Sequence, residues 1–582
     1  MTEYFEVHER DSAARIGELR LETPRYTPAL VDDVLVDAGS EWTADREMPD
    51  GADDTLTVLP HRATPGGTPA EVEEAFAPEY PVVEFPSAAV VSPEIAANHG
   101  TDAYVLSNAQ EVAGHAAALV SAVIETRESI PGDTALYLPG IATPANVATL
   151  AYAGVDLFDT DRAALKATQG KYLTTDGERF LEDLSELPCA CPACRRPVEE
   201  FDREDCIEHN ENALRVALSV VRERIREGRL RDYIEGQARH EGWLTATFRG
   251  LDQQYQYLER RTPLVCQSEM TAATDDTIRR VEIQRYAERV TNRYRNRFDN
   301  PLVLVPCSAR KPYSDSQSHS QFHDAIQYRA HLVSMTSPIG VVPQELELTY
   351  PAQHYDTPVT GEWSATEVDF VASVLEAYLE GNEYPRVIAH VPEEYREICE
   401  RAEQSLGLDV EYTVEDHPTA TSSLANLAST LSDELKYSKR ERQHNTIRAV
   451  ADYQFGEGAG EELFDDLSVE SVYPKLRAQS SDGEQLAMLV AEYGVLSLTI
   501  AGGRRWVESD VPTKRVEIDG FVPHGSVLAP GVVDASESIR PGDDVVIEGP
   551  KAFAVGRANM FGQEMIESTR GIASSVRHVE ER

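Results

Sequence analysis

Three cysteines stand within six residues, and this cluster constrains the local fold more than any other feature of the sequence. Cys189, Cys191 and Cys194 form a C-x-C-x2-C pattern, and His209 follows in a segment of helical pattern. Three thiolates and one imidazole are a sufficient tetrahedral set, so the pattern predicts a knuckle that holds a structural zinc. Cys206 competes for the fourth ligand position, and a metal-free group of core cysteines is the alternative. Such a site contributes to folding and does not by itself indicate catalysis.

The seven cysteines are odd in number and crowded into one stretch, which favours metal or nucleophile chemistry over a disulfide framework. No window approaches the roughly 18 to 20 uninterrupted apolar residues of a membrane span. The first residues, MTEYFEVHER, lack the basic and apolar regions of a signal peptide. We therefore expect a cytoplasmic protein with no membrane partner.

The net charge of −46 is extreme, and only 8 of the 54 basic residues are Lys. Disorder is excluded as a global description because 41% of the residues are hydrophobic and the acids are interspersed with periodic apolar positions. Acidic, lysine-poor surfaces suit proteins of extreme halophiles, since molar salt screens their self-repulsion. In such salt a nucleic-acid partner is not excluded, because binding then depends on shape, stacking and hydrogen bonds instead of a basic patch.

A chain of 582 residues is long enough for roughly three to five domains. From Pro81 short apolar runs alternate with helical stretches, which predicts β/α units around a parallel sheet. The Gly-rich, acidic stretch FGEGAGEELFDD is interpreted as a linker or loop. Short strands with turn residues near the end predict a small β-barrel. The expected domains are 1–265 with the zinc knuckle at 189–209, 295–440, 441–510 and 513–582.

Cys307 directly follows the apolar run LVLV, where a buried strand enters a polar loop. The neighbouring Arg310 and Lys311 give this thiol an electropositive environment, which lowers a thiol pKa and favours the reactive thiolate. A partly buried cysteine beside a basic loop is the alternative. The same loop is dense in further polar side chains, which are Ser308, Tyr313, Ser316, Ser318 and His319.

A second polar cluster lies in GVVPQELELTYPAQHYDTPVTGEW, and it supplies enough groups for base recognition and proton transfer. Taken singly, each of its residues is more often part of loop structure than of catalysis. The members are Glu345, Glu347, Tyr350, His354, Tyr355 and Asp356.

The segment LYLPGIATPANVATLAYAGVDLFDTDRAALKATQGKYLTTDG, with the cysteines and the His209–Asn210 pair, resembles the C-terminal part of tRNA-guanine transglycosylases. These are zinc-bearing TIM-barrel enzymes that exchange a base in tRNA. The resemblance implies that Asp159 occupies the position of the nucleophile and Asp156 that of a second acid. About 185 residues precede the knuckle, fewer than the roughly 250 of a complete barrel, so we expect a trimmed barrel. Asp159 is alternatively a strand-end acid that positions a loop.

The strings PCSARKPYSDSQSHSQF and ELELTYPAQHYDTPVTGEW closely resemble the core of archaeosine synthases. The resemblance implies an amidine-forming transferase that adds an amine to the nitrile of 7-cyano-7-deazaguanine at position 15 of the tRNA D-loop. Lysine is the favoured donor, with glutamine or ammonia nitrogen as alternatives, and a radical partner enzyme would complete archaeosine from the lysine adduct. A homodimer is also expected. The catalytic candidates are Cys307, Lys311, His319, Glu347, Asp356 and Asp159, and the substrate-binding candidates are Ser308, Arg310, Tyr313, Ser316, Ser318, Tyr350, His354 and Tyr355.

A nitrile is a poor electrophile toward amines in neutral water, and two mechanisms are open. Cys307 attacks first and gives a thioimidate that the amine displaces. Alternatively Cys307 is structural, and Asp356 or Glu347 deprotonates the incoming amine.

The C-terminal strings GSVLAPGVVD, RPGDDVVI and AVGRANM resemble a PUA domain, a compact pseudobarrel that binds structured RNA. The expected fold class is therefore α/β multidomain: a trimmed TIM-barrel-like transglycosylase domain with a zinc knuckle, a second α/β core domain, a small α+β domain and a C-terminal β-barrel. The runner-up functions are an active tRNA-guanine transglycosylase and a non-enzymatic tRNA-binding protein.

Overall fold

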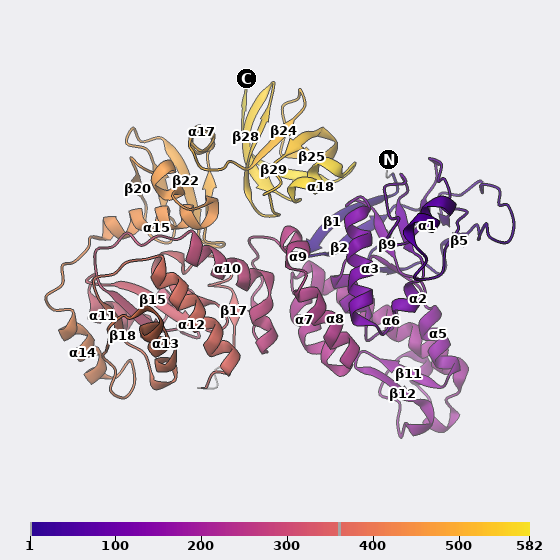
Figure 1. Cartoon of the computed structure of the whole chain (residues 1–582), viewed down its shortest axis with the longest axis horizontal. Helices are drawn as coiled ribbons and strands as arrows, with labels where there is room; N and C mark the ends of the chain where they lie inside the picture. Colours follow the sequence, from indigo (N-terminus) through magenta and orange to yellow (C-terminus); the bar gives the residue numbers. More distant parts are fainter. Residues whose placement is uncertain (1–2, 359–361) are drawn as a thin grey trace. The chain divides into compact units, whose positions relative to one another are not determined.

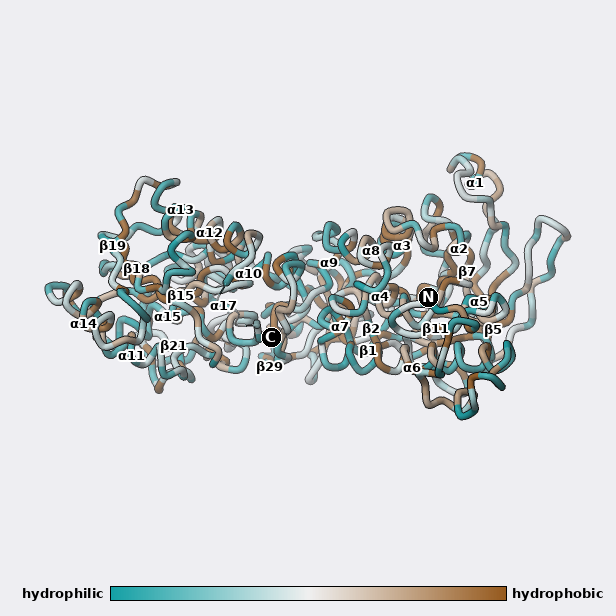
Figure 2. The backbone as a smooth tube through the Cα atoms, turned by 90° about the horizontal axis from the view of Figure 1, so that it is seen from below, coloured by the Kyte–Doolittle hydropathy of each residue, from teal (hydrophilic) through white to brown (hydrophobic). Residues whose placement is uncertain are grey.

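The computed structural model describes residues 3–358 and 362–582, and the chain divides into two compact units (Figure 1). The first unit comprises Met1–Pro263, Ser526–Pro541 and Asn559–Ser574, and the second comprises Leu264–Gly525, Gly542–Ala558 and Ser575–Arg582. Hydrophobic and hydrophilic stretches alternate along the chain (Figure 2). Across the described ranges, no helix combines the length and the apolar composition needed to cross a membrane.

A parallel sheet forms the core of the first unit. Its strand order is β4-β10-β9-β8-β7-β6-β5, and each of the six pairings is parallel. The strands are β4 (Ala29–Leu30), β5 (Leu35–Asp37), β6 (Leu56–Val58), β7 (Ser87–Val91), β8 (Ala103–Leu106), β9 (Ala135–Tyr137) and β10 (Leu157–Phe158).

The two edges of this sheet belong to one bent stretch of chain, so the sheet closes on itself. The N–H of Ala29, in β4, donates to the carbonyl of Asp156 at 3.0 Å, beside β10. Only five residues later, the carbonyl of Val34 accepts from the N–H of Leu56 at 2.8 Å, at the start of β6. Within the described residues this gives a barrel of six strand positions where a complete TIM barrel has eight. The expectation of a trimmed barrel is confirmed.

The knuckle segment follows the barrel. A hairpin of β11 (Lys171–Thr174) and β12 (Gly177–Phe180) leads into it, and α6 (Arg203–Arg226) leaves it. The side chain of Asp202 accepts hydrogen bonds from the first-turn amides of α6, while the carboxylate of Asp205 accepts from the amide of Asp202. This capping box fixes where the helix begins and hence where its inward-facing His209 lies.

A five-stranded sheet lies at the centre of the second unit, in the order β16-β15-β14-β18-β19. All pairings are parallel except that of β16 with β15. The strands are β14 (Leu302–Pro306), β15 (His331–Thr336), β16 (Gly340–Pro343), β18 (Val387–Ala389) and β19 (Val410–Tyr412).

Helices cover both faces of this sheet, which explains the continuous apolar run of β14. Leu302 and Leu304 pack toward α10 (Val281–Asn292), α12 (Ala365–Glu380) and α13 (Arg396–Leu406). On the opposite face, Val303 and Val305 pack with residues of α11 (Gln317–Ile326) and α14 (Thr421–Thr430). The domain is therefore a doubly wound α/β fold of three layers.

A smaller α+β region follows. It contains α15 (Lys439–Phe455), an antiparallel sheet of β20 (Ser468–Glu470), β21 (Arg477–Gln479), β22 (Gln485–Val490) and β23 (Val495–Leu498), and α17 (Ile500–Glu508).

The interpretation of FGEGAGEELFDD as a linker or loop misses a helix. The segment contains the short helix α16 (Ala459–Leu463), whose Ala459 and Leu463 are buried. Gly456 and Gly458 have positive φ angles of 130° and 81°, which end α15 and redirect the chain. The glycines thus serve a tight helix-to-helix turn inside a packed region.

The C-terminal strands form a six-stranded sheet in the order β25-β29-β28-β27-β24-β26. The strands are β24 (Arg515–Ile518), β25 (Ser526–Leu528), β26 (Val532–Ala535), β27 (Asp544–Gly549), β28 (Ala552–Ala558) and β29 (Ile572–Glu581).

Candidate active site and metal-binding cluster

A cavity of about 770 Å³ opens at the carboxyl ends of the parallel strands of the second unit. Its lining includes the segments that follow β14, β15, β18 and β19. The chain leaves β14 for α11 on one face of the sheet and leaves the neighbouring β18 for α13 on the other face. The two connections diverge, and such a switch point is where open α/β sheets bind ligands. The volume lies within the usual range of small-molecule sites.

Cys307 lines this cavity directly after β14 and is half-buried. Its Sγ lies 3.5 Å from the hydroxyl oxygen of Tyr395, which follows β18. Tyr395 also lines the cavity, and its ring packs against that of Trp363 with centroids 4.5 Å apart. Burial and the neighbouring Cys307 raise the pKa of Tyr395, so its hydroxyl stays protonated near neutral pH.

Hydrogen bonds among buried hydroxyls fix the loop after Cys307. The hydroxyls of Tyr313 and Tyr355 are 2.7 Å apart, and that of Tyr355 lies 2.7 Å from Oγ1 of Thr336. Nζ of Lys311 stands 3.8 Å from the ring centroid of Tyr355. Burial lowers the pKa of Lys311, and the neighbouring Cys307, Asp356 and Glu269 oppose that shift.

His319 and Ser316 hold the start of α11. The Ser316 hydroxyl accepts from the His319 amide at 3.2 Å and so caps the helix. The His319 ring is 1% exposed, and its Nε2 donates to the carbonyl of Pro306 at 3.1 Å. Burial lowers the pKa of His319 to about 4. The imidazole is therefore neutral and ties the helix to the residue before Cys307.

Carboxylates dominate the charged lining of the cavity. Six acids and no Lys or Arg occur among the lining residues that the structure describes. The whole chain carries 100 acids against 54 bases, so this ratio is more skewed than the general acidity of the protein. The surface favours a cationic or amine-bearing ligand. The acids are Asp275, Glu362, Glu367, Glu393, Glu394 and Asp416.

The candidates predicted from sequence divide into three groups. Cys307, Ser308 and Ser318 line the cavity. Six others are not among the described lining residues and lie in, or pack against, the loop and helix that follow Cys307. They are Arg310, Lys311, Tyr313, Ser316, His319 and Tyr355. Glu347, Tyr350, His354 and Asp356 are not among the described residues that line the cavity, and their assignment stays a prediction.

Tyr350 and His354, two of the residues outside the lining, make contacts away from the cavity. The Tyr350 hydroxyl lies 3.5 Å from a carboxylate oxygen of Glu282, and the ring of His354 lies 5.9 Å from that of Tyr350. Asp356 is exposed at the end of the short strand β17 (Tyr355–Asp356). Sequence reasoning missed Tyr395 and Trp363, because nothing in the string HVPEEY shows that its strand neighbours the one before Cys307.

The four predicted metal ligands meet in the first unit. Ligand atoms of Cys189, Cys191, Cys194 and His209 all lie within 4.8 Å of one another. The His209 Nε2 donates to the carbonyl of Leu173 at 2.9 Å, which leaves the lone pair of Nδ1 facing the sulfurs. This tautomer is the one a metal-bound imidazole needs, so the donor set fits a metal ion.

Cys206 lies outside this group. Its Sγ contacts the carbonyl oxygen of Lys171 at 3.4 Å. Among the described residues, the fourth position of the cluster is thus supplied by His209.

Asp159 stands directly after β10 at the carboxyl end of the barrel. Its carboxylate accepts hydrogen bonds from the Tyr137 hydroxyl at 2.8 Å, the Gly140 amide at 2.6 Å and the Asp161 amide at 3.0 Å. Burial raises the pKa of Asp159. Asp156 instead forms a buried ion pair with Arg15. Both acids are engaged by protein groups.

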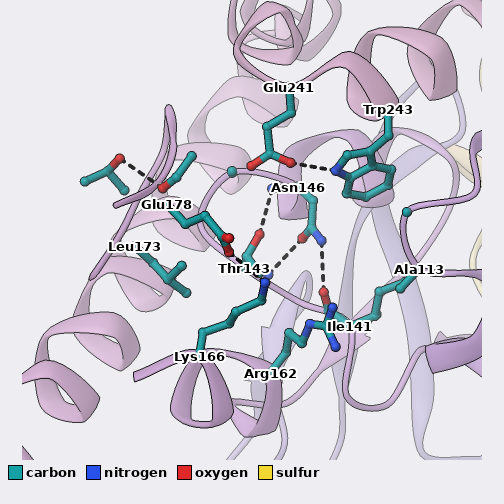
Figure 3. A pocket seen from close by; sticks show the side chains of 14 residues that line it. Ala113, Ile141, Thr143, Asn146, Arg162, Lys166, Leu173, Glu178, Glu241 and Trp243 are labelled. Carbon is teal, nitrogen blue, oxygen red and sulfur yellow. Dashed lines mark hydrogen bonds and ion pairs between the residues drawn. The ribbon is translucent and has the colours of Figure 1, made fainter. Parts of the chain in front are cut away.

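A smaller pocket of about 100 Å³ lies in the first unit (Figure 3). Thr143, Asn146 and Trp243 line it, and Nζ of Lys166 forms an ion pair with Glu178 at 2.7 Å. Its volume is below the range of typical small-molecule sites. The larger cavity beside Cys307 is the better candidate active site.

Comparisons with known proteins match successive parts of the chain to four different families. Residues 90–242 match the family described as Queuine tRNA-ribosyltransferase, and residues 283–431 match a domain of unknown function (DUF5591). Residues 445–512 match the patch-forming domain C2 of tRNA-guanine transglycosylase, and residues 517–579 match the PUA domain. A transglycosylase-type barrel, a separate α/β core with a thiol in its cavity and a PUA module together define a tRNA-modifying enzyme.

Similarity to whole proteins is more specific. The chain is 63% identical to an archaeosine synthase of Haloferax volcanii, with 100% of both chains covered. It is 42% identical to an archaeosine synthase subunit alpha of Methanosarcina acetivorans, again over 100% of each. A tRNA-guanine(15) transglycosylase of Methanothermobacter thermautotrophicus is 28% identical over 79% of this chain and 68% of that protein. The chain belongs to the archaeosine synthase family.

Proposed function

We propose that this chain adds an amine to the nitrile of 7-cyano-7-deazaguanine at position 15 of the tRNA D-loop and so forms the amidine of archaeosine biosynthesis. The observation that carries the proposal is the half-buried Cys307 thiol, held in the cavity at the switch point of the second α/β core. A thiol at such a site is a nucleophile within reach of a bound substrate. Membership of the archaeosine synthase family supplies the reaction class.

In the proposed reaction Cys307 Sγ adds to the nitrile carbon, and the nitrile nitrogen takes up one proton. The product is a thioimidate. The amine nitrogen then bonds to the same carbon, the C–S bond breaks, and sulfur regains the proton that the amine loses. The sum is nitrile plus amine giving amidine, with no oxidant or reductant required.

Lysine is the proposed amine donor, with glutamine or ammonia nitrogen as the alternatives. Six carboxylates and no Lys or Arg line the described part of the cavity, although Arg396 pairs with Glu393 beside it. The carboxylates suit the positive charge that lysine retains on its second amino group. A neutral amide such as glutamine would gain less from this surface.

We assign the remaining candidates by where their side chains lie. Ser308 and Ser318 contact substrate, and Lys311 supplies positive charge near the thiol. Tyr313, Tyr355, Ser316, His319 and Glu347 position the loop. Arg310, whose side chain is 70% exposed, contacts the tRNA backbone. Tyr350, His354 and Asp356 remain proposed substrate or proton-transfer contacts outside the cavity lining.

The Cys189–Cys191–Cys194–His209 cluster would hold a structural zinc, which when bound cross-links the knuckle to α6. tRNA is the proposed macromolecular partner, and the PUA domain at residues 517–579 supports that proposal. A homodimer, a radical partner enzyme that acts on a lysine adduct, and a cytoplasmic location in a halophile are further proposals. The acidic, lysine-poor composition and the Haloferax relative support the last.

The experiment is mass spectrometry of nitrile-bearing tRNA incubated in high salt with the protein and isotopically labelled lysine, glutamine or ammonium. A nucleoside mass gain of one whole lysine is the expected result. Gain of ammonia alone would identify direct amidination. Release of free deazaguanine without any adduct would overturn the proposal in favour of a transglycosylase.

A further inference from the structure

Tyr395 is placed beside the proposed nucleophile by the topology of the second unit. Cys307 follows β14 and Tyr395 follows β18, and these strands are paired in parallel register. Their side chains meet at the cavity with Sγ and the phenolic oxygen 3.5 Å apart. The Tyr395 side chain is 9% exposed and packs against Trp363, so the hydroxyl is held in one place.

We propose that Tyr395 is a catalytic residue that relays protons between the Cys307 sulfur and the nitrogen atoms of the reacting nitrile and amine. This inference rests on the proposed function and adds a residue that the sequence analysis did not single out.

Each relay step is balanced. In the first, the S–C bond forms while the Cys307 S–H proton passes to the Tyr395 oxygen and the Tyr395 O–H proton passes to the nitrile nitrogen. In the second, the amine nitrogen bonds to the thioimidate carbon and loses a proton to the Tyr395 oxygen. The Tyr395 O–H proton then goes to sulfur as the C–S bond breaks. Tyrosine ends both steps neutral, and the thiol is regenerated.

A relay fits this tyrosine better than a full acid–base role. Its raised pKa makes a free tyrosinate costly, and a concerted relay never forms one. A nitrile nitrogen is a very weak base, so it needs its proton as the S–C bond forms. A hydroxyl that accepts from sulfur while it donates to nitrogen meets both requirements.

Neighbouring hydroxyls are already committed to other partners. Thr336 lines the cavity, but its Oγ1 contacts the carbonyl of Ser337 at 3.2 Å and the hydroxyl of Tyr355 at 2.7 Å. Tyr355 is further bound by Tyr313. The Tyr395 hydroxyl, by contrast, contacts the reacting sulfur itself.

The test compares Tyr395→Phe with Tyr412→Phe in the full-length protein. Phenylalanine keeps the ring contact with Trp363 and removes only the hydroxyl. Tyr412 lies on β19, its buried hydroxyl has no hydrogen-bond partner in the described structure, and it does not line the described cavity. Nitrile-bearing tRNA is supplied without amine, and the protein–tRNA thioimidate is measured by single-turnover quench and intact mass. We expect Tyr395→Phe to form it about 100-fold more slowly and Tyr412→Phe to match the wild type.

Two further measurements separate a chemical role from a structural one. Tyr395→Phe should retain its melting temperature, its affinity for the tRNA and the alkylation of Cys307 by iodoacetamide, because the thiol stays in place. Adduct formation at nearly the wild-type rate in Tyr395→Phe would overturn the relay while leaving the proposed function intact. If Tyr395→Phe loses adduct formation and also loses alkylation of Cys307 or stable folding, the relay is overturned as well. The hydroxyl would then act by placing the loop.

Cys307→Ala tests the underlying covalent step on its own. If this variant still converts the nitrile to an amidine, the covalent reaction and the relay both fail. If it is inactive and Tyr395→Phe is slow, both stand.

Discussion

The carboxylate of Glu347 accepts a hydrogen bond from the backbone N–H of Ser314 at 2.8 Å. Its other oxygen accepts from the hydroxyl of Tyr473 at 2.5 Å. Glu347 is 4% exposed, and both oxygens are used to tie the loop that follows Cys307 to the small α+β region. Because both oxygens are engaged, this geometry favours a role for Glu347 in positioning the loop over one in removing protons from substrate.

The first prediction follows from that contact. Glu347→Gln turns one acceptor into a donor that faces an N–H or O–H donor, so we expect the free energy of unfolding to fall by about 1–3 kcal/mol. Turnover should fall as the loop loosens, while the pH–rate profile keeps the wild-type shape. Glu376→Gln, on α12 and not among the described residues that line the cavity, is the control. Disappearance of one limb of the pH profile in Glu347→Gln would instead assign proton transfer to this side chain.

The second prediction concerns the donor. Glu394 and Asp416 are exposed acids on the rim of the cavity. Neutralising both, as Glu394→Gln with Asp416→Asn, should raise the KM for lysine by about three- to tenfold and leave kcat nearly unchanged, because the lost attraction acts on binding. The measurement uses the lowest salt in which the protein stays folded, since salt screens exposed charges. Glu400→Gln, an exposed acid of α13, is the matched control; an unchanged KM for the double variant would count against a cationic donor.

The third prediction concerns the metal cluster. Cys194→Ser removes one thiolate of four ligands, and we expect the bound zinc to fall from about one per chain toward none, with a lower melting temperature. Cys206→Ser keeps all four ligands and should keep the zinc. Elemental analysis and thermal unfolding check both variants. Equal zinc content in the two variants would show that the cluster is not the binding site.

Much of this architecture is predictable from local sequence patterns. The apolar run LVLV indicates a buried strand, and β14 is covered by helices on both faces. The spacing of Cys189, Cys191 and Cys194 indicates a knuckle because ligands close in sequence are close in space. The same locality explains why FGEGAGEELFDD, interpreted as a linker or loop, also contains α16, whose Leu463 is buried.

The cavity itself depends on strand order, which no local pattern reveals. Tyr395 is 88 residues from Cys307, and their contact exists because β18 pairs with β14 although β15 and β16 intervene in sequence. For the same reason Glu347, close in sequence to other polar candidates, lies behind the loop and not among the described residues that line the cavity. Residue types indicate which side chains are chemically able to act, but the order of the strands determines which of them lie in the same cavity.

The fourth prediction is a pH dependence of stability that arises from His319. Burial lowers its pKa from 6.5 to about 4 in the folded protein. Between these values the unfolded chain binds a proton that the folded protein does not, so the free energy of unfolding falls as the pH falls from 6.5 to 4, by up to about 3 kcal/mol. Above pH 6.5 this penalty is absent.

His319→Gln should lose that component while its amide still reaches the Pro306 carbonyl. Denaturant unfolding at pH 7.5 and pH 5 checks it, with His240→Gln, at an exposed histidine, as the control. A wild-type-like fall in stability between the two pH values in His319→Gln would assign the effect to other groups.

The fifth prediction uses Asp159 to distinguish amidine formation from base exchange by a tRNA-guanine transglycosylase. Its carboxylate accepts from Tyr137, Gly140 and Asp161, so the acceptor positions that a nucleophile would turn toward ribose are occupied by the protein. Asp159→Asn should therefore lose about 1–3 kcal/mol of stability and keep amidine formation. The exposed side chain of Asp161 makes Asp161→Asn a matched control, since only its backbone bonds Asp159. Incorporation of labelled guanine into tRNA should be absent from the wild type and both variants. If the wild type incorporates guanine and Asp159→Asn does not, Asp159 is a working nucleophile and the barrel retains base exchange beside the chemistry at Cys307.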